Sequence, residues 1–161
     1  MASTMSQAQR FLNLEALHGG RSKDSSYNAA FYLLSYDPEL YQVAQKCVST
    51  IGVDFSKIKR MTKGFDEASR QLVDVAHNLF SWSSKCKVTP FDISRLPYPY
   101  LELVCNACYI AADQLEVAIE PEKDSLALDD KNYRSTQQFN QQIAEIQQAY
   151  NSADAPEELE R

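Results

Sequence analysis

Two cysteines, Cys105 and Cys108, have the spacing in this chain that most resembles a chemical site. Cys-x-x-Cys pairs bind metal ions or exchange disulfides when they lie in an exposed turn or helix start and when further ligands converge on them. Here the pair lies inside an apolar-periodic run over 98–118, which predicts a helix with both thiols one turn apart on one face. The other cysteines, Cys47 and Cys86, form no second close pair. We therefore expect packed thiols, with no metal site and no cofactor.

The histidines and carboxylates give no stronger indication of catalysis. The sequence pairs His77 with no nucleophile, and His18 precedes Gly19-Gly20, where a cationic ring stabilises a helix C-terminus. The chain has no nucleophile elbow, phosphate-binding loop, dinucleotide fingerprint or His-Glu metal motif. Five aspartates precede or begin expected helices, where N-capping explains most of them: Asp24, Asp37, Asp54, Asp66 and Asp92. We therefore expect no catalytic residues.

The candidate anion-binding residues form the densest basic run of the chain: Lys57, Lys59, Arg60 and Lys63. Such a run can hold a phosphate backbone, although a solvated helical face is the simpler explanation. The net charge of −6 also opposes binding of a polyanion, so we do not expect nucleic acid as a strong partner. That expectation weakens if three further cations lie on the same side as the run: Arg70, Lys85 and Lys87.

Charge and composition divide the chain into two parts. Residues 1–100 carry 12 basic and 9 acidic side chains, whereas residues 101–161 carry 4 and 13. Only four glycines occur, which favours helices with short connections over hairpins or barrels. The sequence has no apolar run of about 18 residues and no apolar signal core at its N-terminus, so we expect a cytoplasmic protein with no membrane partner.

Apolar spacing and helix-start signals predict an all-α fold, a single compact globule of five to six helices with a C-terminal helical arm. Two helices, over 65–82 and 100–118, are expected to pack together at its centre, with Leu72 and Leu103 facing inward. Earlier helices are expected over 7–17 and 38–49. The expected divisions are a core domain over 1–120, an acidic linker over 121–132, an amphipathic helix over 133–150 and an acidic tail over 151–161.

The segment from Asn28 to Tyr41, Asn-Ala-Ala-Phe-Tyr-Leu-Leu-Ser-Tyr-Asp-Pro-Glu-Leu-Tyr, resembles part of an uncharacterised family of small helical proteins from Gram-positive bacteria and their phages. Pro-Phe-Asp-Ile at 90–93 and Leu-Val-Cys-Asn-Ala at 103–107 fit the same family. The resemblance covers roughly residues 10–115. It implies a small helical protein but no catalytic residues.

Four large apolar side chains follow one another at spacings of four, three and four in the expected C-terminal helix: Phe139, Ile143, Ile146 and Tyr150. This is a narrow heptad-like seam, and glutamines occupy many positions between its members. An isolated helix of this length is marginal in water, so the seam must be covered by the globule, by a second copy or by another protein. The sequence leaves all three open, and we favour association.

These features predict a non-enzymatic protein-interaction module that binds another protein or a second copy through its C-terminal helix. With the resemblance, they suggest a phage-type or mobile-element accessory protein that binds a host protein. Two alternatives remain open, a nucleic-acid-binding helical module that uses residues 57–63 and a hydrolase without a recognised motif. Salt-dependent binding of DNA or RNA separates the first alternative from the interaction module.

Overall fold

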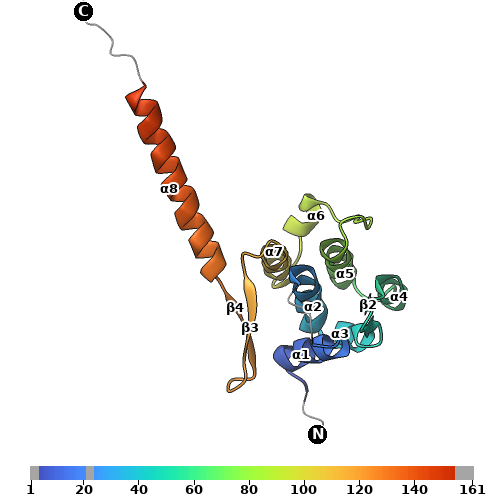
Figure 1. Ribbon diagram of the computed structural model, residues 1–161. Coiled ribbons are helices and arrows are strands. Elements are labelled where there is room, and N and C mark those ends of the chain that lie inside the picture. Colours follow the sequence, from blue (N-terminus) through green and yellow to red (C-terminus); the bar gives the residue numbers. More distant parts are fainter. Residues whose placement is uncertain (1–3, 21–23, 155–161) are drawn as a thin grey trace, which may run out of the picture.

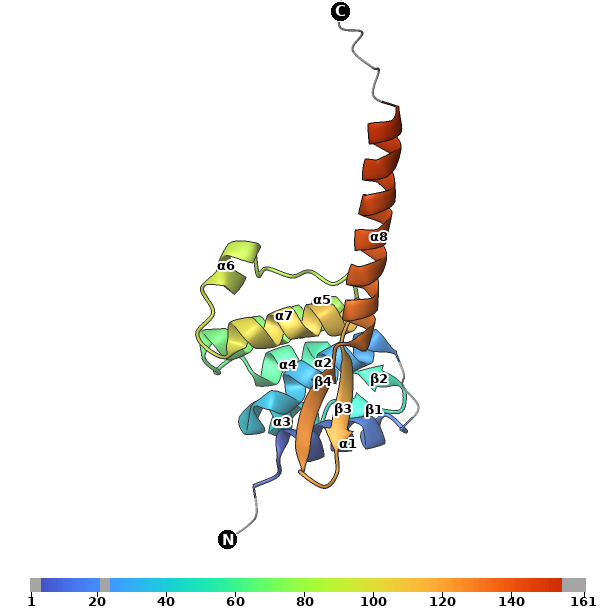
Figure 2. The ribbon, with the colours of Figure 1, turned by 90° about the vertical axis from the view of Figure 1, so that its left-hand side faces the viewer.

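One buried helix, α2 (Ser25–Tyr36), forms the centre of the fold. The computed structural model describes residues 4–20 and 24–154. Seven successive residues of α2, from Ala29 to Ser35, are buried, as expected for a helix that other elements surround. Four helices pack against it, as Figures 1 and 2 show: α1 (Gln7–Leu17), α3 (Pro38–Ala44), α5 (Glu67–Phe80) and α7 (Tyr100–Ala111).

The pair of helices that the sequence places at the centre, α5 and α7, do contact each other. Leu72 on α5 and Leu103 on α7 are buried at 0% and 6% exposure, which confirms the inward faces that their spacing predicts. The two helices nevertheless lie to one side of α2, which the sequence does not single out as the centre. The expected helix over 65–82 ends at Phe80, and Trp82 beyond it is exposed.

Local capping signals begin several helices where the sequence predicts them. Ser6 and Gln9 form a capping box that starts α1, whose bounds match the predicted range. Asp37 accepts backbone N–H bonds at the start of α3, with Pro38 in the first helical position. The remaining expected aspartates also cap helices, including α4 (Phe55–Met61) and α6 (Pro90–Ser94): Asp24, Asp54 and Asp66 as N-caps, and Asp92 within a capping box with Thr89.

The C-terminus of α2 is held by a side chain from another helix. Arg10 of α1 is buried, and its Nε donates to the Ser35 carbonyl oxygen at 2.6 Å. Its Nη2 donates to the Tyr36 carbonyl oxygen at 2.7 Å, and its Nη1 to that of Met5. The last carbonyls of a helix have no partner within the helix, so Arg10 satisfies two of them and joins α1 to α2.

A short hairpin replaces the end of the helix that the sequence predicts over 38–49. The helix α3 stops at Ala44, and β1 (Val48–Ser49) then pairs with β2 (Gly52–Val53) in antiparallel fashion. Cys47 and Val48 are buried in the core, so the apolar residues near this helix end keep their predicted burial although the backbone differs.

A second hairpin replaces both the end of the helix predicted over 100–118 and the linker predicted over 121–132. The helix α7 stops at Ala111, and β3 (Glu116–Glu120) pairs with β4 (Ser125–Asp129). The paired apolar residues of the two strands pack against the core: Val117 with Leu128, and Ile119 with Leu126. The fold is therefore mostly helical, at 61% helix, and not all-α, since the described residues form eight helices and two antiparallel hairpins.

The C-terminal helix, α8 (Lys131–Ala153), extends the predicted range of 133–150 at both ends. It follows the second hairpin directly and stands away from the body, as the two ribbon views agree (Figures 1 and 2). Of the predicted acidic tail over 151–161, residues 155–161 lie outside the described residues. Among the described helices, none combines the length and apolar character that crossing a membrane requires.

Candidate functional site

The predicted seam of α8 is exposed along its whole length. Phe139, Ile146 and Tyr150 are between 61% and 69% exposed, and Ile143 is 39% exposed. Isolated exposed apolar residues are ordinary, but four large ones in a line on one helix make a contiguous apolar strip. The folding back of this seam onto the globule, which the sequence leaves open, does not occur in this structure.

Contacts at its first turn tie α8 to the body. The Tyr133 backbone N–H donates to the Gln114 carbonyl oxygen at 3.0 Å, and Asn132 Nδ2 donates to that of Asp113 at 3.2 Å. The Tyr133 ring packs edge-on against Tyr109, with ring centroids 5.5 Å apart. The base of α8 is therefore anchored next to the end of α7, and the seam begins about one and a half turns beyond this anchor.

A groove between α4, α5 and the segment after α5 brings basic side chains together. Its volume is about 540 Å³, within the usual range for ligand pockets. Five cations line it: Lys59, Lys63, Arg70, Lys85 and Lys87. The three that the sequence could not place, Arg70, Lys85 and Lys87, thus lie on the same side as part of the predicted basic run.

The basic run itself is divided between two surfaces. Lys59 and Lys63 line the groove, whereas Lys57 and Arg60 do not belong to its lining. Lys57 Nζ instead donates to the Lys46 carbonyl oxygen at 3.3 Å, and Arg60 is exposed. Lys57, Lys59 and Arg60 lie on α4, whose helical repeat turns them in different directions, and Lys63 follows the end of this helix.

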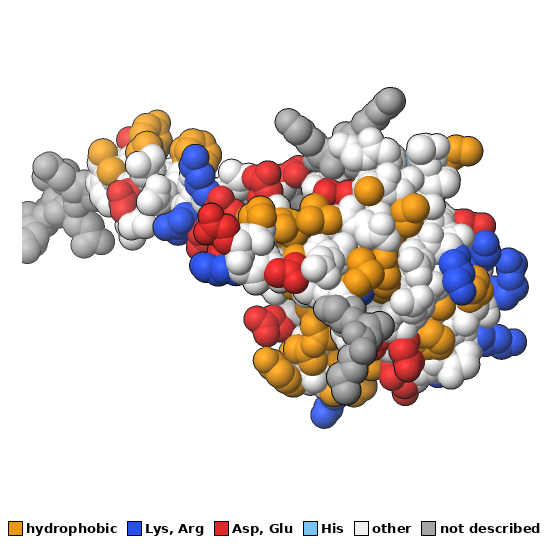
Figure 3. All heavy atoms as spheres, turned by 90° about the horizontal axis from the view of Figure 1, so that it is seen from below, with side chains coloured by type: hydrophobic (Ala, Val, Ile, Leu, Met, Phe, Trp, Pro, Cys, Tyr) orange, Lys and Arg blue, Asp and Glu red, His pale blue; other side chains and the backbone are white. Residues whose placement is uncertain are grey.

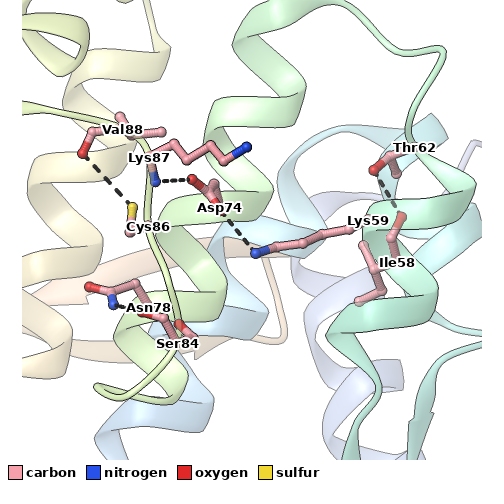
Figure 4. A network of polar contacts seen from close by, with 9 residues as sticks. All are labelled: Ile58, Lys59, Thr62, Asp74, Asn78, Ser84, Cys86, Lys87 and Val88. Carbon is pink, nitrogen blue, oxygen red and sulfur yellow. Dashed lines mark hydrogen bonds and ion pairs between the residues drawn. The ribbon is translucent and has the colours of Figure 1, made fainter.

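Asp74 on α5 joins the walls of the groove, as Figure 4 shows. Its Oδ1 accepts from Lys59 Nζ at 2.9 Å, and its Oδ2 accepts from the Lys87 backbone N–H at 2.7 Å. Burial alone would raise the pKa of Asp74, but the Lys59 hydrogen bond, the Lys87 N–H and the Lys59 charge together hold it below its usual value. The sequence gives no sign of this role, because the three residues come from separate segments.

The segment after α5 is fixed along that helix by a second contact. Asn78 Nδ2 donates to the Ser84 carbonyl oxygen at 3.0 Å, four residues beyond the end of α5. Together with the Asp74 contact to Lys87, this bond holds residues 84–87 beside α5. The side chains of Lys85 and Lys87 therefore line the groove from a segment whose backbone is tied at two points.

The cysteine pair does not have the packed environment that the sequence predicts. Cys105 and Cys108 are exposed on α7, because the buried face of that helix passes through Leu103, Val104 and Ala107. Desolvation of its thiol, and then the neighbouring Cys105, raise the pKa of Cys108. A raised pKa lowers the thiolate fraction and with it the reactivity of a thiol.

The other two cysteines also have raised pKa values. Cys47 is buried and Cys86 is half-buried, and desolvation raises the pKa of each thiol. All four are free thiols, and no cluster of three or more His, Cys, Asp or Glu side chains suited to a metal ion occurs among residues 4–20 and 24–154.

His77 is half-buried on α5 and stacks on the Phe55 ring, with centroids 4.6 Å apart. Burial and the nearby charge of Lys59 lower its pKa, against the opposing effect of Asp74. A neutral, stacked imidazole is therefore the form that this environment favours near neutral pH. The stacking contact gives His77 a packing role between α5 and the Phe55 ring.

A second cavity of about 350 Å³ lies between α1, α2 and the second hairpin. Its polar lining includes Glu15, Asn28, Asp113 and Glu116. Desolvation raises the pKa of Glu15, and Asn28 Oδ1 is buried without a hydrogen-bond partner in the structure. The cavity is thus acidic, in contrast to the groove at α5.

Comparison with known proteins gives no relative. The chain matches no protein-family model, no curated protein and no solved structure. The function must therefore be inferred from α8 and from the basic groove.

Proposed function

We propose that this chain is a non-enzymatic protein-interaction module that associates through α8, and that the partner is α8 of a second copy. The observation that carries the proposal is the line of four exposed apolar side chains on a helix that stands clear of the body: Phe139, Ile143, Ile146 and Tyr150. A helix with apolar side chains at heptad spacing is stabilised when these side chains pack between those of a facing helix. At 23 residues, α8 is about 35 Å long, enough for three heptads.

The uncharged flanks of the seam favour a second copy as the partner. In two-stranded coiled coils, charged residues beside the seam select the partner and its direction. Between positions 135 and 150, Glu145 is the only charged residue of the sequence. The positions beside the seam include Asn140, Gln142 and Gln147. Two identical helices can therefore meet without like-charge repulsion along their contact.

Two double variants test the proposal by light scattering. Ile143→Gln with Ile146→Gln removes the apolar centre of the seam and keeps residues that favour a helix. Gln141→Ala with Gln148→Ala changes two side chains of α8 outside the seam and serves as the matched control. We expect the unchanged chain and the control to form dimers and the seam variant to be monomeric.

Two results would contradict the proposal. Equal masses for all three proteins would show that the seam is not the contact. A monomeric unchanged chain whose seam instead binds a different, purified protein would refute the choice of a second copy. The role as a phage-type or mobile-element accessory protein stays a prediction, because the chain matches no family model, curated protein or solved structure that bears on it.

A further inference from the structure

The basic groove has more positive than negative charge available to a ligand. Of its five cations, Lys59 is bound to Asp74 at 2.9 Å. The other four have no ion pair within residues 4–20 and 24–154: Lys63, Arg70, Lys85 and Lys87. A surface with several unpaired cations around a hollow attracts an anion, because the walls exclude part of the screening solvent.

The acidic residues of the same groove are largely engaged by other groups. Asp74 is held by Lys59 and by the Lys87 backbone N–H. Asp92 Oδ2 accepts from both the backbone N–H and the hydroxyl of Thr89, at 2.8 Å each. Glu67 accepts from Gln71 Nε2 at 3.4 Å, which is a weak contact. Glu67 is therefore the carboxylate of the groove that would repel an anion most directly. Its single negative charge is outweighed by the four cations that have no ion pair.

Exposed aromatic rings lie close in sequence to the residues that line the basic groove. Trp82 is 91% exposed and lies three residues before Lys85. Phe91 is 65% exposed and adjoins Asp92, which lines the groove, and the Arg95 guanidinium lies 5.1 Å from the Phe91 ring centroid. Exposed rings next to a basic groove are the combination that binds single strands, since bases stack on the rings while cations hold the backbone.

The overall negative charge of the chain lies mainly elsewhere. Residues 101–161 contain 13 of the 22 acidic residues. Figure 3 shows basic side chains gathered at the end of the body that carries α4, and acidic side chains near the base of α8. At physiological salt, charges separated by more than about 8 Å are largely screened. The net charge of −6 therefore does not determine the local potential of the groove.

We propose that the groove between α4, α5 and residues 81–89 binds the phosphate backbone of single-stranded nucleic acid, with Trp82 and Phe91 stacking on its bases. An acidic peptide could meet the cations but would leave the rings without a partner, and duplex bases are not free to stack on them. The affinity should be that of a sequence-tolerant site, with a dissociation constant of about 1–100 µM at physiological salt. This site is independent of the α8 seam.

Fluorescence anisotropy with a labelled oligothymidine of about 20 nucleotides tests the proposal. Lys63→Ala, Arg70→Ala and Lys85→Ala together remove three exposed cations of the groove. The matched control replaces three exposed lysines elsewhere, Lys46, Lys123 and Lys131, by alanine and changes the net charge equally. We expect the groove variant to weaken binding at least about tenfold and to flatten the slope of log affinity against log salt by about 2, with little change in the control.

A second variant and two competitors identify the ligand. Trp82→Ala with Phe91→Ala should weaken single-strand binding several-fold, while Leu12→Ala with Ile51→Ala, which changes two exposed apolar residues elsewhere, should not. Competition by unlabelled oligothymidine should be stronger than by a duplex or by polyglutamate. The proposal is wrong if no binding occurs at about 50 mM salt, if both triple variants lose affinity equally, if the aromatic variant binds normally, or if polyglutamate or the duplex competes as well.

Discussion

The aspartates of this chain show how the same side chain acquires different roles from its position. Asp24, Asp37, Asp54 and Asp66 accept backbone N–H bonds at helix starts, where their effect is local. Asp74 lies within α5 and instead connects α5 to α4 and to the segment that carries Lys87. The caps could be predicted from neighbouring residues, whereas the role of Asp74 depends on contacts between segments distant in sequence.

Replacement of Asp74 should give a pH-dependent loss of stability. Asp74→Asn removes the charge that Lys59 and the Lys87 N–H stabilise, and we expect a loss of about 1–2 kcal/mol near pH 7, since Lys59 is partly solvated. The folded-state pKa lies below the ordinary value of 3.8, so the contribution of the carboxylate is present above that value and is lost as the pH falls through the folded pKa.

Urea unfolding of both proteins between about pH 3 and pH 7 measures this difference. The difference in the free energy of unfolding between Asp74→Asn and the unchanged chain should become smaller as the pH falls below 3.8. Glu122→Gln, an equivalent change at an exposed acid, is the control and should show no comparable difference. If the stability loss caused by Asp74→Asn stays constant with pH, the charge of Asp74 does not contribute to stability.

Leu72 provides a direct measure of the core. Leu72→Ala should lower the free energy of unfolding by about 2–5 kcal/mol, because the side chain is fully buried between α5 and its neighbours. Leu103→Ala should fall in the same range or slightly below it, since Leu103 is 6% exposed. Leu12→Ala, at a 45% exposed position of α1, should cost less than about 1 kcal/mol in the same denaturant melts. Equal losses at Leu12 and Leu72 would contradict the assigned faces.

The four thiols should differ in their rates of alkylation. Cys105 is exposed and should react first with iodoacetamide in the folded protein, followed by Cys108, whose pKa is raised. Cys47 is buried and also has a raised pKa, so it should react at least about tenfold more slowly than Cys105. Peptide mass spectrometry gives the order, and the same reaction in urea, where all four should react alike, is the control. Slow alkylation of Cys105 in the folded protein would contradict its exposure and would favour the packed environment that the sequence predicts for it.

Among the structural elements, the second hairpin departs most from the sequence prediction. Val117 and Ile119 alternate with polar or small residues, as do Leu126 and Leu128, which is a strand pattern. The same residues also continue the apolar spacing of α7 for a few positions, and short apolar runs do not distinguish a helix end from a strand. Glycine scarcity misled the prediction as well, because the turn uses Pro121 and a positive φ at Asp124 instead.

Long helices with strong periodicity were predictable in existence and approximate extent. The start of α1 follows from its capping box, and the approximate range of α8 follows from apolar spacing within one segment. The central position of α2 and the Arg10 contacts that hold its end depend on packing between helices, which one sequence does not specify. For the same reason the cations Arg70, Lys85 and Lys87 could be named as candidates for the groove but not placed there.

Two truncations distinguish the hairpin from the predicted linker. A chain ending at Asp130 loses α8 and with it the Tyr133 contacts at the first turn of this helix, so it should be less stable than the full chain by only about 1 kcal/mol in denaturant melts. A chain ending at Glu120 also loses β4 and leaves β3 without its partner, so it should be less stable by about 2–4 kcal/mol, given the half-buried Leu126 and Leu128. Equal stability of the two truncated chains would mean that β4 is not part of the body.

The whole molecule presents two surfaces that differ in chemistry and position. The basic groove lies on the body beside α4 and α5, and the apolar seam lies on α8, which projects from the opposite part of the molecule. Association through α8 would therefore leave the groove accessible and bring two grooves into one particle. Such an arrangement would increase the apparent affinity for a strand long enough to reach both.

Sedimentation equilibrium of the unchanged, full-length chain over a range of concentrations shows whether α8 pairs with a second copy. We expect the apparent mass to rise with concentration from 18.3 kDa toward about twice that value, and the chain ending at Asp130 to remain at the mass of its monomer. An apparent mass that stays at 18.3 kDa up to about 1 mM, where even weak pairing would be detected, would contradict it.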